Sequence, residues 1–147
     1  MFGQLQLGCG VRGGAETAVH VVQSMLEGKV GWIALSEDLR NAFNERARDK
    51  VLSSLYETPA LAPMWRLADW AYRNSSPLVM RNKEGALLEL LESSNGVRQG
   101  DPIAAVLFAV SVQKVFKRAV AVGEDVRGVA VLDDLTFVGP AGAPPTF

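Results

Sequence analysis

Cysteine and histidine are almost absent from this chain of 147 residues. The single cysteine, Cys9, excludes an internal disulfide and any zinc site built from cysteines. The single histidine, His20, falls off the apolar stripe of a predicted helix, and we interpret it as a solvent-facing residue. The chemistry of this chain therefore has to come from other side chains.

Long hydrophobic runs and excess charge are absent too. No apolar stretch approaches the roughly 18–20 residues that a membrane span needs, and the N-terminus does not resemble a signal peptide. The formal net charge is −1, and 48% of the residues are hydrophobic, which is enough for one globular core. We expect an intracellular protein without a membrane partner, in nucleus or cytoplasm.

The patterning predicts helices and hairpins in one domain. Apolar spacing and helix start signals predict helices over residues 15–26, from 45 to about 55 with Asn44 as cap, from Pro63 onward, and from 103 to about 122. Strand-like runs predict a strand ending at Asp38 and a hairpin of residues 76–81 and 86–93, although the leucines of residues 87–91 would also suit a helix. We expect a domain over residues 1–139 and a disordered Pro/Gly tail over residues 140–147.

Two adjacent aspartates, Asp133 and Asp134, stand inside the apolar stretch of residues 128–139. Apolar residues on both sides predict a strand, a tight turn and a second strand, with the carboxylates at the tip. Like charges this close repel each other, so the pair must be solvated or neutralised by a divalent cation. An ordinary solvated hairpin turn remains the alternative.

A third carboxylate, Asp38, closes the apolar run of residues 30–36. Two strand ends that carry acids could meet on adjacent strands and hold a pair of hard cations. Two such metals about 3.5–4 Å apart can activate an attacking hydroxyl and stabilise a leaving oxygen in phosphoryl transfer. The alternative for Asp38 is a turn or helix-capping residue.

Three motifs in order resemble the palm domain of reverse transcriptases, and those of non-LTR retrotransposons most. They are Asp-x-x-Asn-Ala-Phe-Asn at residues 38–44, Gly-Val-Arg-Gln-Gly-Asp-Pro at residues 96–102, and Leu-Asp-Asp at residues 132–134. The segment Gln-Leu-Gly-Cys-Gly-Val-Arg-Gly-Gly-Ala-Glu at residues 6–16 is similar to the one that precedes the palm in that group. The resemblance covers about residues 4–139.

This resemblance implies an α+β fold with an antiparallel palm sheet, helices packed on one face, and part of the fingers. It implies RNA-templated DNA synthesis with Mg²⁺, or Mn²⁺ as a substitute, held by Asp38, Asp133 and Asp134. The implied partners are an RNA template, a DNA primer, deoxynucleoside triphosphates, and further fingers and thumb segments of a longer polyprotein. The residues implied to contact nucleotide or template are Phe43, which would exclude a 2′-hydroxyl, and Arg98, Gln99 and Gly100.

Purely structural interpretations of these residues remain open beside the resemblance. Phe43 would also suit a core position, Gln99 and Gly100 an ordinary turn before a helix, and Asp101 is interpreted as a helix N-cap rather than a metal ligand. Gly8 to Gly13 match the glycine pattern of a dinucleotide-binding loop, but only residues 2–7 are available for the strand that must precede it.

The chain also departs from the family pattern. Val131 stands where an aromatic residue is usual, Glu37 stands where an apolar one is usual, and the charge of −1 is low for a nucleic-acid binder. Upstream finger segments and a thumb are missing, so we expect a fragment of an enzyme. The alternative function is a catalytically inactive remnant that binds nucleic acid or protein weakly at most.

Overall fold

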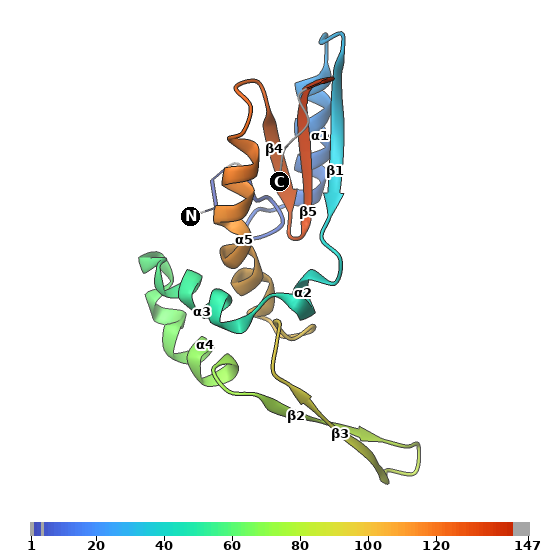
Figure 1. Ribbon diagram of the computed structural model, residues 1–147, viewed down its shortest axis with the longest axis vertical. Helices are drawn as coiled ribbons and strands as arrows, with labels where there is room; N and C mark the ends of the chain where they lie inside the picture. Colours follow the sequence, from blue (N-terminus) through green and yellow to red (C-terminus); the bar gives the residue numbers. More distant parts are fainter. Residues whose placement is uncertain (1, 4, 143–147) are drawn as a thin grey trace. The chain divides into compact units, whose positions relative to one another are not determined.

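The computed structural model describes residues 2–3 and 5–142 and shows an α+β protein with antiparallel sheets, as predicted (Figure 1). The chain divides into two compact units, Met1–Arg40 with Phe108–Phe147, and Asn41–Leu107. None of the helices in the described ranges is both long enough and apolar enough to cross a membrane.

The first unit is built on a three-stranded antiparallel sheet. Strands β1 (Trp32–Asp38), β5 (Asp134–Pro140) and β4 (Arg127–Val131) lie in the order β1-β5-β4, so β5 pairs with both neighbours (Figure 1). Leu135 and Phe137, which share one face of β5, are buried, and so is Val138 on the other face, whereas Asp134 at the start of the strand is exposed. The central place of β5 explains why its residues are so well covered.

Helix α1 (Gly14–Leu26) covers one face of this sheet. Ala18 packs with Leu7 and with Val129 of β4, and Val21, Val22, Met25 and Val131 pack against that cluster. The helix begins where Gly13 takes a φ of 63°, and a Cβ at Gly14 would lie 1.9 Å from the Leu7 carbonyl oxygen. Only glycine permits that approach, so the glycine-rich segment before α1 serves helix packing.

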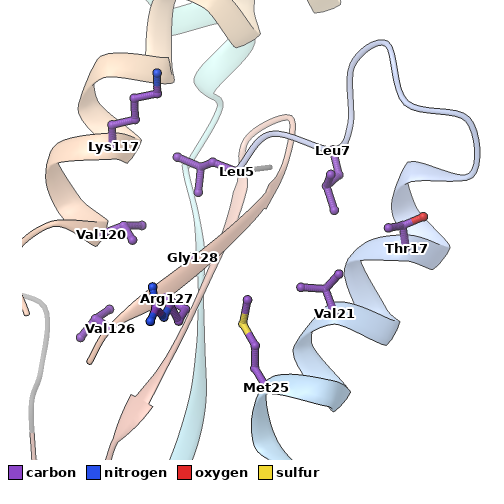
Figure 2. A pocket seen from close by; sticks show the side chains of 10 residues that line it. All are labelled: Leu5, Leu7, Thr17, Val21, Met25, Lys117, Val120, Val126, Arg127 and Gly128. Atoms are coloured by element: carbon purple, nitrogen blue, oxygen red, sulfur yellow. The ribbon is translucent and has the colours of Figure 1, made fainter. Parts of the chain in front are cut away.

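Residues 108–120 of helix α5 (Ala104–Val120) and the N-terminal segment complete this unit. The buried Gln113 donates from Nε2 to the Phe2 carbonyl oxygen at 2.8 Å. A cavity of about 550 Å³ lies beside β4, and Leu5, Leu7 and Met25 project into it (Figure 2). Val120 and Lys117 of α5 line one side of it and Val21 of α1 the other.

The second unit combines short helices with a hairpin. Its elements are α2 (Ala42–Glu45), α3 (Arg48–Tyr56), the 3₁₀ helix η1 (Pro59–Met64), α4 (Trp65–Tyr72), β2 (Ser76–Arg81) and β3 (Leu87–Ser93). Val51, Leu55, Ala68 and Tyr72 are fully buried and form the packed part of α3 and α4. The leucine run of β3 is a strand, and its hairpin with β2 is antiparallel, as predicted.

A buried arginine organises this unit. Arg48 is only 7% exposed and donates to three carbonyl oxygens, Gly96 at 2.9 Å, Asn74 at 3.2 Å and Ser93 at 2.8 Å, and to the Ser93 hydroxyl at 2.8 Å. Burial and the nearby charge of Arg98 lower its pKa. The guanidinium therefore joins the start of α3 to the segment that follows β3.

Two sequence predictions need correction. The single helix from residue 45, capped by Asn44, is wrong: Asn44 lies inside α2, and α3 starts at Arg48. The chain is extended at Arg46 and Ala47, and the Arg46 carbonyl oxygen accepts from Gly96 N at 3.1 Å, so long-range pairing interrupts the helix. The helix expected from Pro63 starts as α4 at Trp65, because Pro63 lies within the 3₁₀ turn before it.

The last strand extends to Pro140, the first residue of the predicted tail. Pro140 ends β5 opposite Trp32, and Ala141 donates to the Gly31 carbonyl oxygen at 2.7 Å. The rest of the tail predicted over residues 140–147 lies outside the described residues from 143 onward.

Candidate metal and nucleotide site

Strand pairing brings the three predicted acids of the first unit together. In the β1–β5 register Asp38 stands directly opposite Asp134, and Val131 of β4 stands opposite Asp134 on the other side. Leu132 and Asp133 form the two-residue loop between β4 and β5. Directly opposed residues have Cβ atoms about 4.5–5.5 Å apart. The strand-turn-strand geometry predicted from the sequence is therefore the observed one.

The local electrostatics follow from this proximity. Burial raises the pKa of Asp134, and the negative charges of Asp133 and Asp38 raise it further. Asp38 and Asp134 are exposed and Asp133 is half-buried. Across the described ranges none of the three carboxylate groups makes a hydrogen bond or an ion pair with another residue. The site is thus a cluster of like charges whose oxygens face solvent.

The carboxylates suit a hard cation but do not enclose one. In the described part of the chain, no set of three His, Cys, Asp or Glu side chains is arranged to hold a metal ion. Magnesium seldom needs such a cage, because it is usually bound by one or two carboxylates together with water and substrate phosphates. Unpaired carboxylates on adjacent strands fit that mode of binding.

Asp134 also lines a cavity of about 510 Å³ beneath α1. Ser36 and Thr136, which share its face of the sheet, line it too and approach each other to 3.3 Å between hydroxyl oxygens. Val131 packs against the cluster beneath α1 instead of presenting the aromatic ring usual at this position. The 550 Å³ cavity of Figure 2 contains no carboxylate in its lining.

The turn that carries Asp133 has an uncommon backbone and a buried partner. Leu132 has a φ of 57°, which non-glycine residues rarely adopt. Both of its backbone polar groups bond to the side chain of Gln6, which is fully buried. Sequence reasoning missed Gln6 as a site residue. Its only signal was a polar residue between two leucines at the start of the glycine-rich segment.

The other predicted residues lie in the second unit. Val97 donates from its backbone to the Phe43 carbonyl oxygen at 2.7 Å, so the segment after β3 is bonded to the loop that carries Phe43. Gln99 and Gly100 are exposed and Phe43 is half-buried. Within this unit the structure brings Phe43 and the segment of Arg98, Gln99 and Gly100 together, whereas Asp38, Asp133 and Asp134 belong to the first unit.

Arg98 and Asp101 are bound into a network around Tyr72. Arg98 donates to the Ala71 carbonyl oxygen at 2.7 Å and to the Ser76 hydroxyl at 3.0 Å, and its guanidinium lies 5.0 Å from the Tyr72 ring. The Tyr72 hydroxyl donates to Asp101 Oδ2 at 2.5 Å. Burial and that bond raise the pKa of Tyr72 to about 12.

Asp101 closes the turn before α5 rather than facing an open site. Its Oδ1 accepts from the Ile103 backbone at 3.0 Å, and its carbonyl oxygen accepts from the Ala104 backbone at 3.0 Å. The predicted capping role of Asp101 agrees with this geometry.

Comparison with known proteins places these features. No protein-family model matches the chain. The chain is similar to the retrotransposable element SLACS 132 kDa protein of Trypanosoma brucei gambiense, with 29% identity over 139 residues. That match spans 95% of this chain but only 11% of the length of the relative.

The fold is similar to solved structures of telomerase. One is telomerase from Candida tropicalis in complex with a TWJ fragment of telomeric RNA, with a TM-score of 0.62 and 13% identity over 95% of this chain and 26% of that one. Telomerase from Candida albicans with a TWJ fragment gives a TM-score of 0.61 and 14% identity over 86% and 26%. Identities this low demonstrate a common fold only.

These findings confirm the resemblance predicted from the motifs and the predicted palm-and-fingers fold. The chain is similar to part of a retrotransposable element protein, and its fold is similar to part of telomerase.

Proposed function

We propose that this chain is the palm and part of the fingers of an RNA-directed DNA polymerase that acts within a longer protein. The observation that carries the proposal is the register that sets Asp38 opposite Asp134, with Asp133 next to it in the β4–β5 turn. Acids with this spacing on adjacent strands are the protein's part of a two-metal nucleotidyl-transfer site.

The resemblance to reverse transcriptases assigns a role to each acid. Asp38 and Asp133 are the principal ligands and Asp134 the secondary one, with Mg²⁺ as the metal and Mn²⁺ as a substitute. The bound metals supply charge neutralisation for the triphosphate and acidify the attacking hydroxyl. The reaction joins the primer 3′-oxygen to the α-phosphorus of a deoxynucleoside triphosphate, breaks the bond to the β-phosphate oxygen, and releases pyrophosphate.

The second unit supplies selectivity in this proposal. Phe43 excludes the 2′-hydroxyl of a ribonucleotide, and Gln99 and Gly100, both exposed, contact template and incoming nucleotide. Arg98 contributes by holding their backbone, because its bonds to Ala71 and Ser76 anchor the segment.

The first test is metal binding by the 147-residue chain. Titration with MnCl₂, followed by calorimetry and by thermal unfolding, should show saturable binding. At ten times Kd it should stabilise the fold by about 1.4 kcal/mol. Asp133→Asn should abolish most of that gain, whereas Asp125→Asn, which removes another exposed acid of the first unit, should retain it. An equal gain in the Asp133→Asn variant would place the metal elsewhere and refute the site.

The second test is primer extension on an RNA template, with this chain and with a longer chain that contains it. The isolated chain should bind primer and template weakly and with a shallow dependence on salt, because a chain with a net charge of −1 neutralises few phosphates. The longer chain should extend the primer, Asp133→Asn should not, and Phe43→Val should admit ribonucleotides.

The replacement of the usual aromatic residue by Val131, packed under α1, favours a second candidate function. This is a palm-like module that binds nucleic acid or protein without catalysis. Metal binding without extension by the longer chain would select this second function.

A further inference from the structure

The side chain of Gln6 makes two hydrogen bonds to the turn that carries the acids and a third to Gly8. Its Nε2 donates to the Leu132 carbonyl oxygen at 3.0 Å, and its Oε1 accepts from the Leu132 backbone N–H at 2.8 Å. The same Oε1 accepts from the Gly8 backbone at 3.0 Å. One buried carboxamide thus satisfies both backbone groups of the residue before Asp133.

The backbone around Gln6 is itself fixed against β4. Ala130 donates to the Leu5 carbonyl oxygen at 2.6 Å, and Leu7 donates to the Ala130 carbonyl oxygen at 2.8 Å, in a parallel bridge between Gln6 and Ala130. Leu5 and Leu7 project into the cavity between α5 and α1, on either side of Gln6 in the chain (Figure 2). The carboxamide is therefore mounted on a segment that is tied to the strand leading into the turn.

Gly8 shows how closely this segment approaches the turn. A Cβ there would lie 2.6 Å from the Leu132 nitrogen and 3.0 Å from the Val131 carbonyl carbon. These are backbone atoms and cannot rotate away. Any side chain at Gly8 would push the turn off the Gln6 carboxamide or displace the segment.

This arrangement bears on Asp133 through Leu132. The Leu132 carbonyl belongs to the peptide plane that continues into Asp133, so holding that oxygen orients the backbone from which the Asp133 carboxylate projects. Leu132 has a φ of 57°, a conformation that the surroundings must impose on a leucine. Strand pairing holds Asp38 and Asp134 directly, whereas Asp133 stands in the loop beyond the paired residues.

We propose that Gln6 is a positioning residue for the acidic site: its carboxamide imposes the turn conformation at Leu132 and so sets the Asp133 carboxylate beside Asp38. The metal-binding half of this inference rests on the proposed function, whereas the conformational half does not. Neutral side chains that orient metal ligands typically contribute 10–100-fold to metal affinity.

The experiment compares Gln6→Met with Gln113→Met. Both variants remove a buried carboxamide of the first unit that bonds to backbone from a distant part of the chain, but only Gln6 touches the turn. Amide hydrogen exchange by NMR, with the Asp133 and Asp134 amide shifts, reports the turn. Calorimetric titration with MnCl₂ reports the site.

In Gln6→Met the Leu132 amide should exchange faster relative to Ala130, the Asp133 and Asp134 shifts should change, and Mn²⁺ affinity should fall by about 10–100-fold. Gln113→Met should leave the Leu132 exchange, the Asp133 and Asp134 shifts and the Mn²⁺ affinity as in the wild type, even if it lowers the melting temperature as much as Gln6→Met does. Gly8→Ala should give the same changes as Gln6→Met, because its Cβ would displace the turn at Leu132. It serves as the test of the proposal if Gln6→Met does not fold.

Unchanged Leu132 exchange and unchanged Asp133 and Asp134 shifts in the folded variant would overturn the proposal. So would an equal loss of Mn²⁺ affinity in Gln113→Met, since the effect would then reflect general stability. If the wild type binds no Mn²⁺, or Asp133→Asn binds it equally, the proposed function fails. The conformational half is still decided by the amide data.

Discussion

Gly96 and Gly100 offer a matched pair of substitutions in the segment that leads from β3 to α5. Both have positive φ, 68° and 85°, so an alanine at either position carries the same kind of backbone penalty. They differ in their surroundings. A Cβ at Gly96 would lie 2.4 Å from the carbonyl oxygens of both Phe43 and Asn44, whereas at Gly100 nothing lies within 4 Å.

The expected magnitudes follow from these two contributions. Left-handed backbone costs a residue with a Cβ roughly 1–2 kcal/mol relative to glycine, and this applies to both variants. Overpacking adds about 1–3 kcal/mol, and it applies only to Gly96. We therefore expect Gly100→Ala to lower the free energy of unfolding by about 1–2 kcal/mol and Gly96→Ala by about 2–5 kcal/mol.

The clash also has a structural consequence for the candidate nucleotide site. Gly96 N donates to the Arg46 carbonyl oxygen at 3.1 Å and Val97 N to that of Phe43 at 2.7 Å, so the segment can relieve the clash only by giving up these bonds. Gly96→Ala should then increase amide exchange at position 96 and at Val97, and Gly100→Ala should not.

The assay is urea unfolding followed by circular dichroism, with exchange of the α3 amides as a probe of the second unit alone. In thermal unfolding of a chain of this size each kcal/mol corresponds to about 2–4 °C in melting temperature, so the overpacking at Gly96 should separate the two variants by about 2–12 °C. Equal destabilisation by the two alanines would refute the close approach of Gly96 to the Phe43 backbone.

Three further substitutions probe the site and its support. Arg48→Met should lower the free energy of unfolding by about 3–5 kcal/mol in urea titration, because it leaves buried carbonyl oxygens of Gly96 and Ser93 without their donor. Tyr72 has a pKa raised to about 12, so between pH 10 and 12 the folded protein keeps a proton that the unfolded chain releases. The free energy of unfolding of the wild type should therefore fall by up to about 2–3 kcal/mol as pH rises from about 10 to 12, and that of Tyr72→Phe should not. Asp134→Asn should stabilise the metal-free protein at pH 7 by less than about 1 kcal/mol, because the raised pKa means that folding disfavours the carboxylate. That gain should vanish as pH falls below the ordinary aspartate pKa, in melting curves recorded across the range.

The acidic site was predictable because its determinants are local. Apolar residues on both sides of Asp133 and Asp134 predict a hairpin with acids at its tip, and a strand that ends in Asp38 predicts a carboxylate at a strand end. The observed register of Asp38 opposite Asp134 needs only that these two strands be neighbours. The order of the motifs, which indicates a polymerase palm, predicted that these two strands are neighbours.

Two failures of sequence reasoning share one cause, which is hydrogen bonding to a distant part of the chain. The helix expected from residue 45 is interrupted because Arg46 and Phe43 present carbonyl oxygens to Gly96 and Val97, about 50 residues later. Helix propensity reports on neighbours within a turn and carries no information about such partners. Gln6 was missed for the same reason, since its bonds to Leu132 span 126 positions.

The position of the acids is thus set by restraints of two kinds that do not depend on a cation. Main-chain pairing of β5 with β1 and β4 holds Asp38 and Asp134, and the Gln6 carboxamide holds the turn at Leu132. Repulsion among the three carboxylates acts to spread them, and only covalent and hydrogen-bonded scaffolding opposes it in the absence of metal. A neutral amide suits this purpose better than an arginine or lysine would. It holds the backbone through two bonds, yet adds no positive charge that would compete with a divalent ion for the same oxygens.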